Sequence, residues 1–91
     1  MSYIIKVEVL EQHGHCAAGH KIGDEVIFDF EKNEIKGKIC FHALYSMFPK
    51  IFAMAYGASF PWLKDPDYAT HACPDAYNPV IFAVKRTKKK E

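Results

Sequence analysis

Only one segment of this chain repeats its apolar residues with helical spacing, which limits the fold to one main helix. The segment begins near Cys40 and ends before Gly57, a residue type that tolerates the positive φ found after helix ends. Pro49 lies in its middle and removes one intrahelical hydrogen bond. We expect a helix kinked at Pro49, or two short helices that meet there. We expect its apolar stripe to pack in the core: Leu44, Met47, Phe48, Ile51, Phe52, Met54 and Ala55.

Three other segments have the pattern of strands. Residues 3–11 and 25–30 alternate between apolar and polar side chains, which is typical of strands with one buried face. Residues 80–84 are apolar throughout, which suits a strand covered on both faces. The expected fold is therefore α+β: a small, mainly antiparallel sheet of about three strands with one kinked helix and a long Pro-rich loop.

The Pro-rich loop is expected at residues 59–79, where four prolines disfavour helix and favour turns. A segment of about 20 residues without regular structure is unusual in a compact domain unless it has a function. Because the segment also carries several aromatic residues, we expect it to fold across the core.

The length of 91 residues leaves room for one domain, which we place at residues 1–84, followed by a basic C-terminal tail at residues 85–91. The tail has a net charge of +4 and the rest has −3, whereas nucleic-acid binding needs a basic face on the folded part. We therefore expect a solvated tail and no nucleic-acid partner. An apolar fraction of 49%, with one Trp, five Tyr and seven Phe, exceeds what so small a core usually holds and favours a homo-oligomer.

The location is expected to be cytoplasmic. The first residues have neither the basic start nor the unbroken apolar core of a signal peptide. No apolar run approaches the about 20 residues of a membrane span, so no membrane partner is expected. Three cysteines, an odd number, argue against a disulfide framework and leave thiols for metal or redox chemistry.

Residues 13–20 hold three histidines and one cysteine in eight positions. Two of these side chains, Cys16 and His20, form a Cys₃His set with the distant Cys40 and Cys73. Zinc favours four such sulfur and nitrogen ligands, and iron is the rival if one coordination position stays open. We expect a metal site at these four residues, either structural or open to a small ligand. The competing interpretation is that the cysteines are small buried hydrophobic residues.

Thiol chemistry is a second interpretation of the same residues. Cys40 precedes the expected helix, and the N-terminus of a helix favours the thiolate form of a cysteine. His20, or alternatively His42, is then the candidate base of a catalytic pair with Cys40.

A third candidate site, for a small-molecule ligand, lies in the Pro-rich segment. Trp62 with Asp65 and Asp67 could bind a small or cationic ligand through an aromatic face and carboxylates. An Asp-Pro-Asp sequence is also good turn chemistry, so a segment that packs as a lid over the core explains the same residues.

Four motifs follow one another along the chain: C-A-A-G-H-K-I-G-D at residues 16–24, I-C leading into A-L at 39–44, F-P-W with D-P-D at 60–67, and A-C-P-D with N-P-V at 72–80. In this combination the chain resembles a family of small uncharacterised bacterial and archaeal proteins of about this length. The family pattern marks the positions of Cys16, His20, Cys40 and Cys73. The resemblance therefore implies a Cys/His site at these positions and assigns no activity to it.

Together these observations predict a small cytosolic protein with a Cys/His site that binds a metal. Two alternatives remain open. One is a thiol-dependent enzyme that uses a Cys/His pair, and the other is a metal-free small-molecule-binding or accessory oligomeric protein.

Overall fold

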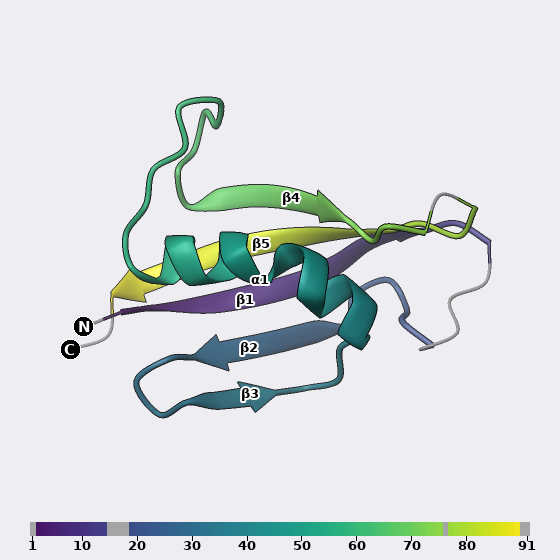
Figure 1. Cartoon of the computed structure of the whole chain (residues 1–91), viewed down its shortest axis with the longest axis horizontal. Coiled ribbons are helices and arrows are strands. Elements are labelled where there is room, and N and C mark those ends of the chain that lie inside the picture. Colours follow the sequence, from purple (N-terminus) through teal and green to yellow (C-terminus); the bar gives the residue numbers. More distant parts are fainter. Residues whose placement is uncertain (1, 15–18, 76, 90–91) are drawn as a thin grey trace.

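A computed structural model describes residues 2–14, 19–75 and 77–89 of the chain. This part forms one five-stranded antiparallel sheet with a single helix on one face (Figure 1). The strand order is β3-β2-β1-β5-β4, so the first and last strands pair at the centre. The elements are β1 (Tyr3–Gln12), β2 (Glu25–Asp29), β3 (Glu34–Lys36), α1 (Phe41–Ala55), β4 (Tyr68–Ala72) and β5 (Val80–Lys89).

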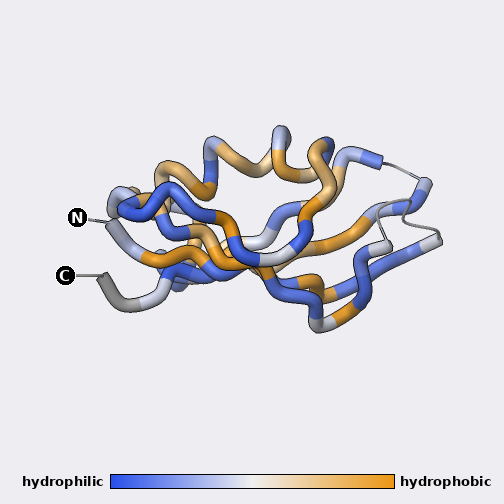
Figure 2. The backbone as a smooth tube through the Cα atoms, turned by 90° about the horizontal axis from the view of Figure 1, so that it is seen from below, coloured by the Kyte–Doolittle hydropathy of each residue, from blue (hydrophilic) through white to orange (hydrophobic). Residues whose placement is uncertain are grey.

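The core lies between α1 and the inner face of the sheet. Val7 of β1 pairs with Val26 of β2 and with Val84 of β5, so one layer of β-branched side chains crosses three strands. Each is buried, and α1 covers them with Met47 and Ile51. Figure 2 shows the helix as a separate layer beside the sheet, with hydrophobic residues in both layers.

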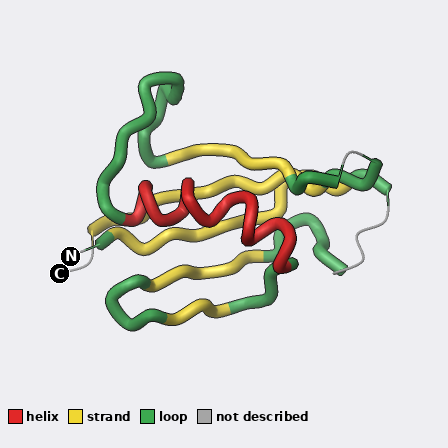
Figure 3. The backbone as a smooth tube through the Cα atoms, in the orientation of Figure 1, coloured by secondary structure: helices red, strands yellow, loops and turns green. Residues whose placement is uncertain are grey.

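The expectation of about three strands is wrong, because the sheet also contains β3 and β4 (Figure 3). β3 has three residues, all exposed, so no hydrophobic alternation marks it in the sequence. β4 lies inside the segment expected to be an irregular loop, and its inward positions are Ala69 and His71, opposite Val84 and Phe82 of β5. Because neither Ala69 nor His71 is a large apolar residue, the sequence of β4 lacks the apolar–polar alternation that predicts a strand.

The rest of the Pro-rich segment also differs from the expectation. Residues 56–67 extend away from the sheet past the edge strand β4 before the chain returns to it (Figure 3). Phe60 and Leu63 still pack partly against the core, whereas Trp62 is exposed and stacks on Phe60.

The last strand is longer than expected. Residues 85–89, which the sequence assigned to a basic tail, continue β5, and Ile5 and Lys6 of β1 pair with Arg86 and Lys85. Lys85 forms an ion pair with Glu8 on the outer face of the sheet. Arg86 points to the inner face and is buried.

The helix is one continuous element that contains Pro49. Pro49 cannot donate a hydrogen bond to the carbonyl of Tyr45, and both residues lie on the exposed side of α1. Water can therefore take the place of the missing donor, and the helix continues through the proline. None of the helices in the described ranges is long and apolar enough to cross a bilayer.

Candidate functional site

The helix begins at a contact between Cys40 and His20. Cys40 is the N-cap residue of α1, and its side chain makes no capping hydrogen bond. Its backbone N–H donates to Nε2 of His20, with 3.0 Å between the nitrogens. His20 is 3% exposed, and its ring meets Phe82 edge to face at 5.6 Å. The loop from β1 to β2 thereby holds the start of the helix.

A tight turn positions His20. The carboxylate of Asp24 accepts a hydrogen bond from the N–H of Lys21, and Gly23 has a φ of +93°, which favours glycine. The N–H of Gly23 donates to the carbonyl of Val9, and the N–H of Val9 donates to the carbonyl of Asp24. The turn is thus fastened to β1, next to the layer that contains Phe82.

Burial lowers the pKa of His20, since desolvation disfavours the charged ring. Asp24 acts in the opposite direction, and Lys38 lowers the pKa further. The ring is therefore neutral at pH 7. Because Nε2 accepts the N–H of Cys40, the proton of the neutral ring belongs on Nδ1. In this arrangement the lone pair on Nε2 of His20 accepts the hydrogen bond from the first residue before the helix, Cys40.

The structure places the expected metal ligands only in part. His20 and Cys40 lie together, whereas Cys16 lies outside the described residues. Cys73 follows β4, and its N–H donates to the carbonyl of Val80. Cys40 and Cys73 are half-buried free thiols. In the described ranges no group of three His, Cys, Asp or Glu side chains could hold a metal ion, so His20, Cys40 and Cys73 do not form one.

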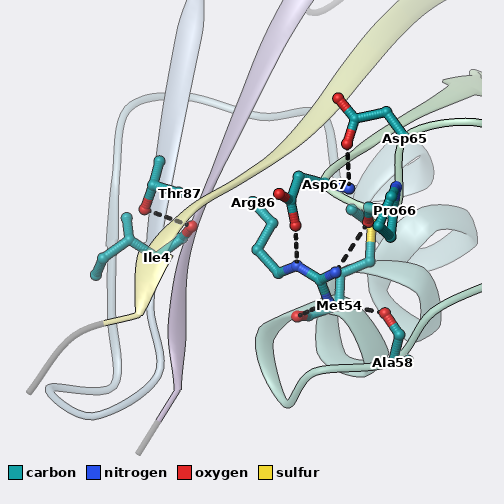
Figure 4. A network of polar contacts seen from close by, with 8 residues as sticks. All are labelled: Ile4, Met54, Ala58, Asp65, Pro66, Asp67, Arg86 and Thr87. Carbon is teal, nitrogen blue, oxygen red and sulfur yellow. Dashed lines mark hydrogen bonds and ion pairs between the residues drawn. The ribbon is translucent and has the colours of Figure 1, made fainter.

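Asp65 and Asp67, expected to bind a ligand, each accept a hydrogen bond from within the protein. The carboxylate of Asp65 accepts the N–H of Asp67 at 2.9 Å, which closes a turn around Pro66. The carboxylate of Asp67 accepts a hydrogen bond from Nε of Arg86 at 2.8 Å (Figure 4). Trp62 is exposed on the loop of residues 56–67, called here the projecting loop.

Arg86 is the residue that sequence analysis missed, because the basic residues around it resemble a tail. Its side chain is 5% exposed and lies 4.7 Å from the centre of the Tyr3 ring. Besides Asp67, its guanidinium donates to three carbonyls, those of Met54, Ala58 and Pro66 (Figure 4). This set of bonds joins the end of α1, the projecting loop and β5, and it compensates for the burial of the charge.

A polar seam lies between α1 and β4. Nε2 of His71 is 2.9 Å from the hydroxyl of Ser46, and that hydroxyl donates to the carbonyl of Ala43. The ring therefore donates to Ser46, so it is not placed as a base for this hydroxyl. Lys50 donates to the carbonyl of Thr70 on β4. Burial lowers the pKa of Lys50 and of His71, and nearby Lys50 lowers that of His71 further. The seam fastens the edge strand to the helix.

The opposite side of α1 carries a row of exposed aromatic side chains, called here the aromatic stripe: Phe41, Tyr45, Phe48, Phe52 and Tyr56. The sequence-based expectation that Phe48 and Phe52 pack in the core is wrong, since they are 38% and 51% exposed. Met47, Ile51 and Met54 face the sheet instead. The sequence signal for this second face is the presence of Phe41 and Tyr45 outside the buried stripe, at helical spacing from Phe48.

The hairpin β2–β3 forms a wall beside the stripe. The ring of Phe30 lies 5.9 Å from Phe48, 5.7 Å from Phe52 and 5.8 Å from Tyr56. A hollow of about 270 Å³ opens between the hairpin and Phe48, and Ile35 lines both this hollow and a second one at the helix start. A third hollow, between Phe41 and Pro49, shares Phe48 with the first hollow and Phe41 with the second. We call these three neighbouring, mostly apolar hollows together the aromatic groove.

Comparison of the chain with protein-family models, with curated proteins and with solved structures found no match.

Proposed function

We propose that this chain is an accessory binding protein, and that the aromatic groove is its binding surface for an apolar or aromatic partner. The aromatic stripe is the observation that carries the proposal. Its five side chains share one side of α1 at steps of four, three, four and four residues. A contiguous exposed apolar patch of this kind is typical of interaction sites, whereas single exposed apolar residues are ordinary.

The chemistry of the groove supports an apolar partner. The only charged residue of α1, Lys50, is bonded to β4 on the other side of the helix. Aromatic side chains supply large contact area with few rotatable bonds, and they are enriched at binding surfaces. A homo-oligomer is one way to use such a surface. We place this activity in the cytoplasm, where a reducing environment keeps Cys40 and Cys73 as thiols.

The test uses a neutral dye that fluoresces in apolar sites, such as Nile red, with dilute full-length protein. We expect the wild type to bind the dye and Phe52→Glu to lose most of the binding, because the charge lies against the ring of Phe30, which lines the hollow beside Phe48. Trp62→Glu is the matched control, since Trp62 is also an exposed aromatic residue but lies on the projecting loop. Equal dye binding by the wild type and Phe52→Glu would contradict the proposal.

A second candidate function is metal binding at Cys16, His20, Cys40 and Cys73, which requires Cys73 to approach His20 and Cys40. Two observations favour it: His20 lies against the backbone of Cys40, and its lowered pKa favours the neutral ring that binds metals. Zinc or iron at His20 would compete with the Cys40 N–H for the single lone pair of the neutral ring.

Elemental analysis of protein purified without chelators tests this candidate. About one metal ion per chain, lost in Cys16→Ser, would support it, in line with the four-ligand preference of zinc. The amide NMR signal of Cys40 should then shift between the metal-loaded and chelator-treated protein. Absence of metal from the wild type would contradict it.

A further inference from the structure

We infer that the partner of the aromatic groove is a second copy of this chain, whose helix α1 packs antiparallel to the first across a two-fold axis. This inference rests on the function proposed above, because it names the occupant of the same surface. The axis passes near Phe48 and Pro49, at the middle of α1.

The sequence positions of the stripe are symmetric about this point. Phe41 and Tyr56 stand equally far from the Phe48–Pro49 bond along the chain, and so do Tyr45 and Phe52. An antiparallel copy related by the two-fold axis therefore sets the two members of each pair opposite each other, and each contact occurs twice. A surface with this arrangement is complementary to itself.

The charges at the two ends of the groove favour the same orientation. Lys36 and Lys38 precede the helix and lie at the end where α1 begins. The hairpin tip, residues 29–34, carries three carboxylates and one lysine. It lies beside the C-terminal half of α1, because Phe30 packs against Tyr56. The two-fold axis reverses the helix direction and keeps the hairpins on the same side, so the basic end of each copy faces the acidic tip of the other.

The exposed area of the stripe approaches the area that a stable dimer buries. The five side chains of the stripe are 38–86% exposed, which corresponds to roughly 600 Å² per copy if each large aromatic residue offers about 200 Å². Ile35 on the hairpin wall, also half exposed, adds to this surface. A standard interface buries about 800 Å² per partner, so the stripe and the hairpin wall together supply most of what is needed.

Sedimentation equilibrium of the full-length protein over a range of concentrations tests the inference. We expect a monomer–dimer equilibrium in which Tyr45→Glu raises the dissociation constant at least about 100-fold, as loss of a central aromatic anchor does. Tyr77→Glu, an equally exposed site outside the stripe, should leave the equilibrium unchanged. Far-UV circular dichroism confirms folding, and Phe41→Glu at another exposed stripe position provides a second variant.

The register is tested by mixing two variants. A chain with Tyr45→Glu and a chain with Phe52→Lys should each be monomeric alone, and the mixture should form a heterodimer at least about tenfold more stable than either homodimer, because opposite charges then meet. A mixture of Tyr45→Glu with Tyr56→Lys is the control and should show no such rescue, because these positions do not face each other.

A wild-type protein that stays monomeric, or a dimer that persists in Tyr45→Glu, would overturn the inference. A dimer disrupted by Tyr45→Glu but not rescued in the 45/52 mixture would overturn the two-fold register. If the protein stays monomeric while Nile red still binds the groove, the binding function stands and only the second copy as partner fails.

Discussion

At the scale of single residues, His20 shows how a side chain expected to bind a metal can hold the start of a helix. His20→Phe keeps an aromatic ring in the pocket but removes the acceptor of the Cys40 N–H. Leaving this donor without a partner should lower the free energy of unfolding by about 1–3 kcal/mol, as measured by urea denaturation. His13→Phe is the control, since His13 is exposed, and it should change the stability little. Equal stability of all three proteins would argue that the contact is dispensable.

The lowered pKa values of His20 and His71 predict a pH dependence with a definite sign. Below about pH 6.5 the unfolded chain takes up protons at these histidines before the folded chain does. Stability should therefore be complete above this pH and fall as the pH decreases, by at most about 1.4 kcal/mol per pH unit for each histidine. Urea denaturation between pH 7.5 and 5.5 measures this slope. A double variant, His20→Phe with His71→Phe, should flatten it, and an unchanged slope would contradict the assignment.

In this chain, sequence patterns predict the role of a residue only when its residue type has a single common role. Cysteine and histidine can bind metals, cap helices or fill a core, and the choice between these roles depends on neighbours that are distant in the sequence. The acceptor role of His20 toward Cys40, 20 residues away, is of this kind. So is the role of Asp67, whose carboxylate is taken by Arg86.

At the scale of elements, the strands that the sequence predicts have large apolar residues, at alternate positions in β1 and β2 and without interruption at the start of β5. β3 and β4 could not be predicted, because pairing with a neighbour, and not burial of large side chains, makes them strands. The helix could be located, but not its two apolar faces. Periodicity indicates that a residue lies on an apolar face, and it does not tell which apolar face meets the sheet.

The hydrogen bonds of Arg86 join α1, the projecting loop and β5, and they predict how much the stability of the fold depends on this junction. Arg86→Met would leave the carbonyls of Met54 and Ala58 without their donor at the end of α1. We expect a loss of about 3 kcal/mol in the free energy of unfolding, since breaking a buried charge network leaves polar groups unpaired. Lys85→Met, one residue earlier and on the outer face, should have a much smaller effect, because its ion pair with Glu8 is partly exposed. Similar losses in both variants would contradict the role of Arg86.

At the scale of the whole molecule, the apolar residues of α1 form two surfaces. One packs in the core against the sheet, and the other is the exposed aromatic stripe. The charges at the ends of the outer surface predict a salt-sensitive dimer. Glu34→Lys and Lys38→Glu should each weaken dimerisation about 3- to 10-fold at low salt, because like charges then meet in two places. The double variant should restore the wild-type dissociation constant, measured by sedimentation equilibrium. A double variant as weak as the singles would contradict the antiparallel orientation.

The pairing of β1 with β5 at the centre of the sheet also has a consequence for biosynthesis. Val7 and Val9 of β1 are translated more than seventy residues before their partners Val84 and Phe82. The β1–β5 pair therefore cannot form while the ribosome is still translating the segment between these strands. Until it forms, α1 has no complete sheet to pack against. Contacts this distant in sequence fold slowly compared with local ones. The sheet can be completed only after residues 80–89 have left the ribosome, so until then the buried face of α1 lacks the central strand pair that it covers.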